Sequence, residues 1–250
     1  MEEPIILKTR QADVIIDYKV KVKDIILIIE KICENSVYAY RNQICKGFIT
    51  IKGGHRVGIT GTAVCDNEKI INLKNITSLN FRIAKQIIGC SNKILKEIID
   101  MENQTVYNTL IISPPGKGKT TILRDTIRNI SNGIKEFNFK GMICGVVDER
   151  GEIAAIHNGI PQNDIGIRTD VIENITKSKG IKMLIRSMAP EVIACDEIGS
   201  KEDVEAIKEA MNSGVKGIFT MHGRTMEDIK NNEDIKKLID SKKIEKIIFI

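Results

Sequence analysis

Aromatic side chains are scarce in this 250-residue chain, which has no tryptophan and only 4% aromatic residues. Proteins that hold single-stranded nucleic acid stack its bases on aromatic rings, so this composition offers no stacking platform. The net charge of +5 is spread along the chain, whereas nucleic-acid binders usually concentrate their basic residues in a patch. These two observations argue against nucleic acid as a partner.

Long apolar runs are also missing. The longest uninterrupted ones, such as Ile25–Ile29, are far shorter than the roughly 20 residues that a membrane-spanning helix requires. The chain starts Met-Glu-Glu-Pro, which is acidic and lacks the apolar core of a secretory signal. We therefore expect a cytoplasmic protein with no segment that spans a bilayer.

No two cysteines have the C-x-x-C spacing that is typical of a zinc site. Cys144 and Cys195 fall inside apolar stretches, where cysteine behaves as a small hydrophobic residue. We expect free thiols in a reducing compartment. The chain's cysteines are Cys33, Cys45, Cys65, Cys90, Cys144 and Cys195.

The chain divides into two regions with different patterns. Residues 1–103 mix short strands and helices, which predicts a small α+β domain. In residues 104–250 short apolar strands alternate with helices, which predicts an α/β domain with a mostly parallel sheet covered on both faces. The first region's expected strands are 5–9, 14–17, 48–51, 57–64 and 78–84, with helices 22–45 and 90–101. The second region's expected strands are 108–112, 142–147, 192–195, 217–221 and 246–250, with helices 120–130, 179–188, 201–212 and 225–239.

A phosphate-binding loop stands between the first strand and helix of the second region. Gly116 and Gly118 allow a tight turn in which several backbone N–H groups point at phosphate oxygens. The following helix N-terminus adds the positive end of its dipole. Lys119 is placed to reach the β- and γ-phosphates of ATP, and the Thr120 hydroxyl to ligate Mg²⁺.

This loop departs from the G-x-x-x-x-G-K-[ST] pattern at one position, because Ser113 stands where the first glycine is usual. The strand directly before it and the helix directly after it support the assignment over a Gly-rich turn that merely caps a helix. The expected nucleotide-binding residues are Ser113, Pro114, Pro115, Gly116, Lys117, Gly118, Lys119, Thr120 and Thr121.

Carboxylates follow two of the other predicted strands. Asp196 and Glu197 end the strand 192–195, as in a Walker B motif, where Asp holds Mg²⁺ and the adjacent Glu polarises the attacking water. Asp148 and Glu149 end the strand 142–147, which lies between the two motifs in sequence as in RecA-like ATPases. Strand ends meet at one edge of a parallel sheet, so Glu149 competes with Glu197 for the role of general base.

His222 follows the strand 217–221 and precedes Gly223. As a third polar group at a strand end of this sheet, it is placed to sense the γ-phosphate. His157 has no such placement, and we expect it on the surface.

Four motifs follow one another along the chain: the P-loop Ser113–Thr120, an acidic box Val147–Glu152, a Walker B segment Ile185–Gly199 and a histidine box Thr220–Gly223. In these motifs and in their order, the chain resembles the secretion ATPases of type II and type IV pilus systems. It is more closely similar to the stage III sporulation protein AA family of endospore-forming bacteria. That resemblance covers nearly the whole chain and is carried by Gly47–Gly61, Ser78–Ala84, Pro161–Asp170 and Asp196–Gly199. From the resemblance we expect part of the family's N-terminal segment to be missing here, so the boundary of the first domain stays open.

The resemblance implies an ATPase with a RecA-like domain that assembles into a ring, with nucleotide between subunits. It also implies a role in powering or gating the sporulation channel between mother cell and forespore, docked to membrane-embedded channel proteins. Two alternatives stay open: a RecA-like nucleic-acid motor, and a nucleotide-gated scaffold with little turnover.

Ring ATPases often complete the site with an arginine from the neighbouring subunit. Arg82 is the first candidate, because it lies on the last expected strand of the N-terminal domain, a region that faces bound nucleotide in the secretion ATPases that this chain resembles. Arg168 is the second, because its loop is polar and attached to the catalytic sheet. Arg56 and Arg186 are further candidates.

Overall fold

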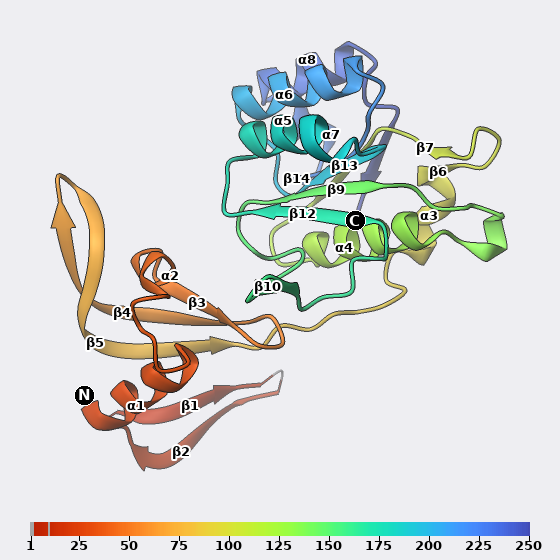
Figure 1. Ribbon diagram of the computed structural model, residues 1–250. Helices are drawn as coiled ribbons and strands as arrows, with labels where there is room; N and C mark the ends of the chain where they lie inside the picture. The colour runs from red at the N-terminus through yellow and green to blue at the C-terminus, as the bar shows by residue number, and fades with distance from the viewer. Residues whose placement is uncertain (1–2, 10) are drawn as a thin grey trace. The chain divides into compact units, whose positions relative to one another are not determined.

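Six parallel strands form the central sheet of the larger of two units, in a computed structural model that describes residues 3–9 and 11–250 (Figure 1). Contacts divide the chain into Met1–Ala84 and Lys85–Ile250. The strand order is β12-β9-β13-β14-β8-β15. Their bounds are β8 Thr109–Ser113, β9 Cys144–Asp148, β12 Thr169–Glu173, β13 Val192–Cys195, β14 Lys216–His222 and β15 Lys246–Phe249.

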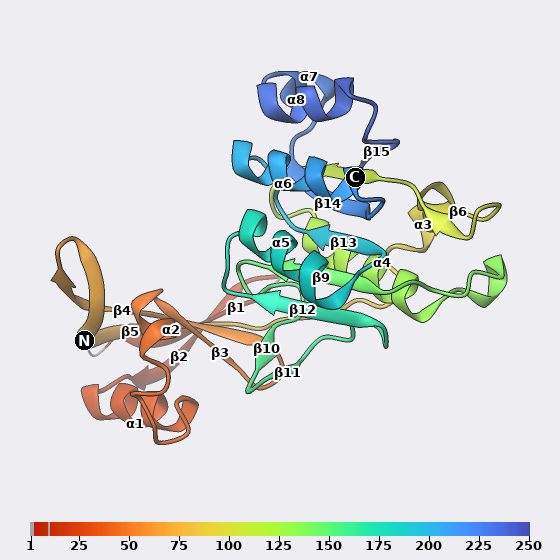
Figure 2. The same cartoon turned by 45° about the horizontal axis from the view of Figure 1, so that its top comes forward.

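The sheet is covered by helices on both faces because successive side chains on each strand point to opposite sides (Figures 1 and 2). On one face Ile111 packs with Leu123 and Ile127. On the other, Leu110 and Ile112 pack with the remaining helices. The helices are α3 Asn92–Ile98 and α4 Lys119–Asn132 on the first face, and α5 Lys177–Met188, α6 Lys201–Asn212, α7 Met226–Lys230 and α8 Glu233–Asp240 on the second.

Short elements complete the larger unit. The strands β6 Ile99–Asp100 and β7 Thr105–Val106 pair with each other, as do β10 Ile156–His157 and β11 Ile160–Pro161. The 3-10 helix η1 Lys135–Phe137 follows α4.

The smaller unit is a separate α+β assembly. It has a core of Cys33, Tyr40, Ile44, Ile49 and Ile59. A hairpin of two strands stands beside a three-stranded antiparallel sheet in the order β3-β4-β5. Its elements are β1 Pro4–Lys8, β2 Asp13–Lys19, α1 Val22–Ile32, α2 Arg41–Cys45, β3 Phe48–Ile51, β4 His55–Asp66 and β5 Lys69–Arg82.

The division between the units differs from the expected boundary near residue 103. Residues 85–103 pack into the larger unit, where Leu95, Ile98 and Ile99 are buried in the same core as the P-loop helix α4. These apolar residues of α3 and β6 bury their surface in the core between the six-stranded sheet and α4. The joint therefore lies directly after the long strand β5, and not at the polar residues 102–104.

Several elements differ from the sequence-based expectation. The expected helix 22–45 is two helices, because the chain takes a left-handed backbone at Glu34 and Asn35. The expected helix 225–239 is also two, because the Asn232 side chain accepts from the Ile235 N–H and starts α8 afresh. The edge strand β12 and the short strands β6, β7, β10 and β11 were not expected. Strand β5 begins at Lys69, well before the expected strand 78–84, and the other expected strands are present with shifts of a few residues.

No helix among residues 3–9 and 11–250 is long and apolar enough to cross a membrane. Cys33, Cys144 and Cys195 are buried free thiols. Burial raises the pKa of Cys144 to about 12, so this thiol stays protonated and acts as a hydrophobic residue.

Candidate nucleotide-binding site

The P-loop joins β8 to α4 at the carboxyl edge of the sheet. Gly116 and Gly118 have φ values of 74° and 86°, a left-handed conformation that side-chain-bearing residues rarely adopt. No atom lies within 4 Å of where a Cβ would stand on either glycine. The left-handed backbone at both glycines and the open space beside them suit a loop that wraps around a phosphate group. Between them, Lys117 is exposed, as are Pro115 and both glycines.

Ser113, the residue that departs from the P-loop pattern, is fully buried at the end of β8. It is not among the described residues with positive φ, so its backbone does not need a glycine. Its hydroxyl donates to the carbonyl of the half-buried Pro114 at 3.1 Å. The substitution therefore leaves the loop's start intact.

Lys119 is the first residue of α4. Its ammonium group lies beside Glu197, which follows β13, and His222, which ends β14. Nζ is 3.4 Å from Glu197 Oε1 and 2.9 Å from His222 Nδ1. His222 Nε2 lies 2.7 Å from the same Glu197 oxygen. The fold thus brings Lys119 against two residues that lie 78 and 103 positions further along the sequence.

The sheet order explains this convergence. Strand β14 lies between β13 and β8, with His222 opposite Ser113 in the register. The strand that separates the P-loop from Walker B in space is therefore β14, whereas β9, which separates them in sequence, lies on the far side of β13. Asp196 and Glu197 directly follow β13. All these strand ends open on one edge, as expected for a parallel sheet.

Asp196 is held by two threonine hydroxyls. Thr120 Oγ1 donates to Asp196 Oδ2 at 2.5 Å, and the buried Thr220 donates to Oδ1. Thr220 also accepts from the Glu197 N–H at 2.8 Å. Thr220 was not predicted as a site residue. A threonine inside an apolar strand cannot be assigned to the site until it is known which strand lies beside it and which side chains it contacts.

Glu197 is a half-buried carboxylate between cations. Its Oε2 accepts from Arg150 Nη1 at 2.5 Å, while Oε1 faces Lys119 and His222. Burial alone would raise the pKa of Glu197, but the charges of Lys119, Arg150 and His222 outweigh burial and lower it. Glu197 also has a φ of 53°, a left-handed conformation that is uncommon outside glycine.

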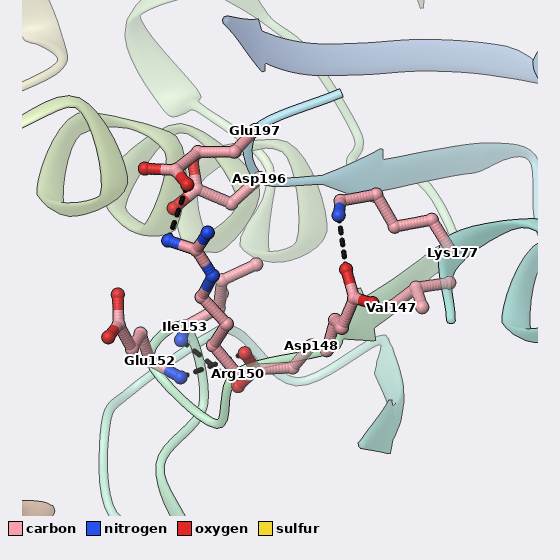
Figure 3. A pocket seen from close by; sticks show the side chains of 9 residues that line it. Val147, Asp148, Arg150, Glu152, Ile153, Lys177, Asp196 and Glu197 are labelled. Atoms are coloured by element: carbon pink, nitrogen blue, oxygen red, sulfur yellow. Dashed lines mark hydrogen bonds and ion pairs between the residues drawn. The ribbon is translucent and has the colours of Figure 1, made fainter. Parts of the chain in front are cut away.

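The acidic box lines the neighbouring pocket at the ends of β9 and β13 (Figure 3). Glu149 forms an ion pair with Lys177 of α5 instead of facing Lys119. Asp148 is buried and accepts from the N–H groups of Glu152, Ile153 and Ala154. Asp148 therefore shapes the loop after β9.

Arg124 of α4 ties the P-loop helix to this same loop. Its guanidinium is buried and donates to the carbonyls of Ile153 at 2.7 Å and Glu152 at 2.6 Å. Burial lowers the pKa of Arg124, against the opposing charge of Asp148. Arg124 thus joins the P-loop helix to the loop of the acidic box through two hydrogen bonds.

The other sequence-based candidates lie elsewhere in the chain. Arg168 donates to the Ser131 carbonyl near the end of α4, at the amino edge of the sheet. Arg186 is exposed on α5, and Thr121 is half-buried on α4. His157, expected on the surface, is half-buried in β10.

Arg82 ends β5 in the smaller unit, where it pairs across the sheet with Arg56. The Arg56 guanidinium stacks over the Phe48 ring at 4.1 Å from the centroid.

Comparison with known proteins gives a family and a fold. A model of the family described as "Sporulation stage III, protein AA" matches residues 2–250. Stage III sporulation protein AA of Bacillus subtilis (strain 168) is 38% identical over 248 residues, which cover 99% of this chain and 79% of that protein.

Two solved structures share the fold. The ATPase DotB of Legionella pneumophila aligns with a TM-score of 0.60 at 16% identity, covering 96% of this chain and 67% of that one. The pilus retraction motor PilT with bound ADP also aligns with a TM-score of 0.60, at 14% identity, covering 94% and 65%. The α/β architecture with a parallel sheet is therefore that of RecA-like ATPases, as the sequence predicted.

Proposed function

The chain belongs to the Sporulation stage III, protein AA family, and from that premise we propose that it hydrolyses ATP as a secretion-type ATPase. The observation that carries the proposal is the meeting of Lys119, Glu197 and His222 beside the Thr120–Asp196 pair. A general base, a phosphate-binding cation and a metal-binding pair are the parts that phosphoryl transfer to water requires. The structural likeness to PilT with bound ADP supports a nucleotide at this edge.

In this proposal the ATP phosphates lie in the P-loop. Backbone N–H groups of Gly116–Thr121 and the α4 N-terminus bind the phosphate oxygens. Lys119 leaves Glu197 for the β- and γ-phosphates, because a phosphate carries more negative charge than a single carboxylate. Its burial at 5% exposure keeps the ammonium group aimed at the site.

The residues present fit Mg²⁺. The Thr120 hydroxyl and Asp196 carboxylate offer two oxygen atoms within hydrogen-bond distance of each other, and oxygen is the ligand that Mg²⁺ prefers. A bound Mg²⁺ neutralises charge that develops on the phosphates. Thr220 holds Asp196 in place for this role.

Glu197 is the proposed general base. Water attacks the γ-phosphorus in line with the leaving ADP, Glu197 accepts the proton from that water, and ADP and phosphate are released. His222 sits where it can report the γ-phosphate, since it touches both Lys119 and Glu197. Glu149 remains the competing base, but its ion pair with Lys177 favours Glu197.

The proposed cellular role is to power or gate the sporulation channel between mother cell and forespore, as a cytoplasmic oligomer docked on membrane-embedded channel proteins. Arg82 is the proposed arginine supplied to a neighbour's nucleotide. Arg82 ends β5, where it lies opposite Arg56 in the strand register.

Single-turnover kinetics with light scattering tests the enzyme against a nucleotide-gated scaffold. With enzyme in excess over ATP and Mg²⁺ present, the proposal expects conversion of bound ATP to ADP, and a larger mass with nucleotide than without it. Tight ATP binding with no conversion over hours would instead make the protein a scaffold.

A further inference from the structure

Arg150, a residue of the acidic box, reaches the proposed base. It follows Asp148 and Glu149 at the end of β9, and its Nη1 lies 2.5 Å from Glu197 Oε2 (Figure 3). The other oxygen of the same carboxylate faces Lys119. The Glu197 carboxylate thus stands between the P-loop cation and Arg150.

The Arg150 side chain is 62% exposed, against 19% for Glu197. An ion pair with one partner this exposed contributes little to folding, since water screens it and the side chain loses rotamer freedom. Stability is therefore a weak reason for an arginine here. The second cation that lines this pocket, Lys177, is paired with Glu149 and 10% exposed.

We propose that Arg150 binds the γ-phosphate of ATP within its own chain, bridging that phosphate and the Glu197 carboxylate. This inference rests on the proposed nucleotide site. When Lys119 turns to the phosphates, Glu197 faces a phosphate group with no cation between them. The guanidinium carries five donors in a planar fork, enough to serve both anions at once.

The consequence is discrimination between ATP and ADP. ADP has no γ-phosphate, so Arg150 stays on Glu197 and adds nothing to ADP binding. With ATP, the bridge adds charge-assisted hydrogen bonds that ADP cannot make. Arg150 thereby makes the site selective for the substrate over its product.

Binding constants for two nucleotides test this assignment. Wild type, Arg150→Ala and Arg150→Lys are titrated by calorimetry with ADP and with the non-hydrolysable analogue AMP-PNP, both with Mg²⁺. Lys135→Ala is the matched loss of one positive charge, because the exposed Lys135 precedes β9 and lies at the opposite edge of the sheet.

Arg150→Ala is expected to weaken AMP-PNP binding about tenfold, the size of a lost charge-assisted hydrogen bond, and to leave ADP binding within about twofold. Arg150→Lys keeps the charge but loses the fork, so it should fall between wild type and Arg150→Ala. Lys135→Ala should match wild type with both nucleotides.

An unchanged ratio of AMP-PNP to ADP affinity in Arg150→Ala overturns the proposal. Tighter AMP-PNP binding does so too, because Arg150 would then only restrain Glu197. Failure of the proposed function would give a different result. If wild type binds neither ADP nor AMP-PNP, the assignment of the nucleotide site is wrong, and the role of Arg150 is wrong with it.

Discussion

Glu197 contacts Lys119, Arg150 and His222 and has a left-handed backbone conformation. A non-glycine residue in the left-handed region costs about 1 kcal/mol or more, and such strain persists only where the surroundings fix it. Here the Thr220 hydroxyl accepts from the Glu197 N–H and donates to Asp196. Thr220 thus sets both carboxylates from the neighbouring strand.

Replacing Glu197 by glutamine keeps the shape and removes the base. We expect Glu197→Gln to bind ATP and to lower kcat by roughly 10²–10⁴-fold, the range for loss of a general base. Glu149→Gln is the matched control, since it changes the other candidate carboxylate. Phosphate release under saturating ATP compares them, and near-normal turnover in Glu197→Gln with loss in Glu149→Gln would transfer the role to Glu149.

At this scale the sequence predicts residues that end strands. Lys119, Asp196, Glu197 and His222 meet as expected, because parallel strands place their carboxyl ends on one edge. Thr220 and the ion pairs of Arg150 and Lys177 were not predicted. These contacts depend on which strands are neighbours and on side-chain rotamers, and neither can be predicted from a single sequence.

Helix α4 is the element that connects the nucleotide loop to the rest of the larger unit. Its buried Asp125 accepts from the N–H groups of Gly89 and Ser91, from the Ser91 hydroxyl and from Arg128. The segment that follows the smaller unit is thereby fastened to the P-loop helix. Burial would raise the pKa of Asp125, but the hydrogen bonds from Ser91, Gly89 and Arg128 outweigh burial and lower it.

Asp125→Asn should destabilise the larger unit by roughly 1–3 kcal/mol at pH 7, because Arg128 and the backbone of residues 89–91 lose a charged acceptor. The folded pKa lies below the unfolded one, so this contribution is complete above about pH 4 and is lost as the pH falls further. Urea denaturation of wild type and Asp125→Asn at several pH values measures the difference between their free energies of unfolding.

The difference in free energy of unfolding between wild type and Asp125→Asn should therefore narrow as the pH falls below about 4, because Asp125 takes up a proton in the unfolded chain before it does so in the folded protein. The thiol of Cys90 and the guanidinium of Arg128 face this carboxylate. A difference that stays constant over the whole range would show that the Asp125 charge contributes no stability.

Elements with a strong apolar pattern were predicted well, and boundaries set by tertiary contacts were not. Strand β13 and helix α6 lie where the sequence placed them. Strand β12 was missed because its residues are only half-buried at the sheet edge and alternate weakly. The joint between the units was placed too late because α3 looks like any amphipathic helix, and only its packing against α4 assigns it to the larger unit.

For the whole molecule, the central question is whether one chain completes its neighbour's site. If Arg82 acts on a neighbouring subunit's nucleotide, then Arg82→Ala and Lys119→Ala should each be inactive alone and regain ATPase activity when mixed. In one of the two mixed interfaces an intact P-loop meets an intact arginine. Phosphate release measured over a range of mixing ratios reports this recovery.

Subunit exchange is the control for this experiment, followed by mass measurement of labelled chains. Arg168→Ala mixed with Lys119→Ala is the matched comparison, because Arg168 is held on the Ser131 carbonyl within its own chain. Absence of recovery for Arg82→Ala at every ratio, with exchange demonstrated, would remove Arg82 from this role.

The most direct test of the whole account is phosphate release from ATP by wild type and Lys119→Ala with Mg²⁺. We expect wild type to hydrolyse ATP and Lys119→Ala to release phosphate at least about 100-fold more slowly, because the buried ammonium group binds the phosphates in the proposed site. The circular dichroism of the two should match. A wild type that releases no phosphate, or a Lys119→Ala that releases it at the wild-type rate, would contradict the assignment of this site.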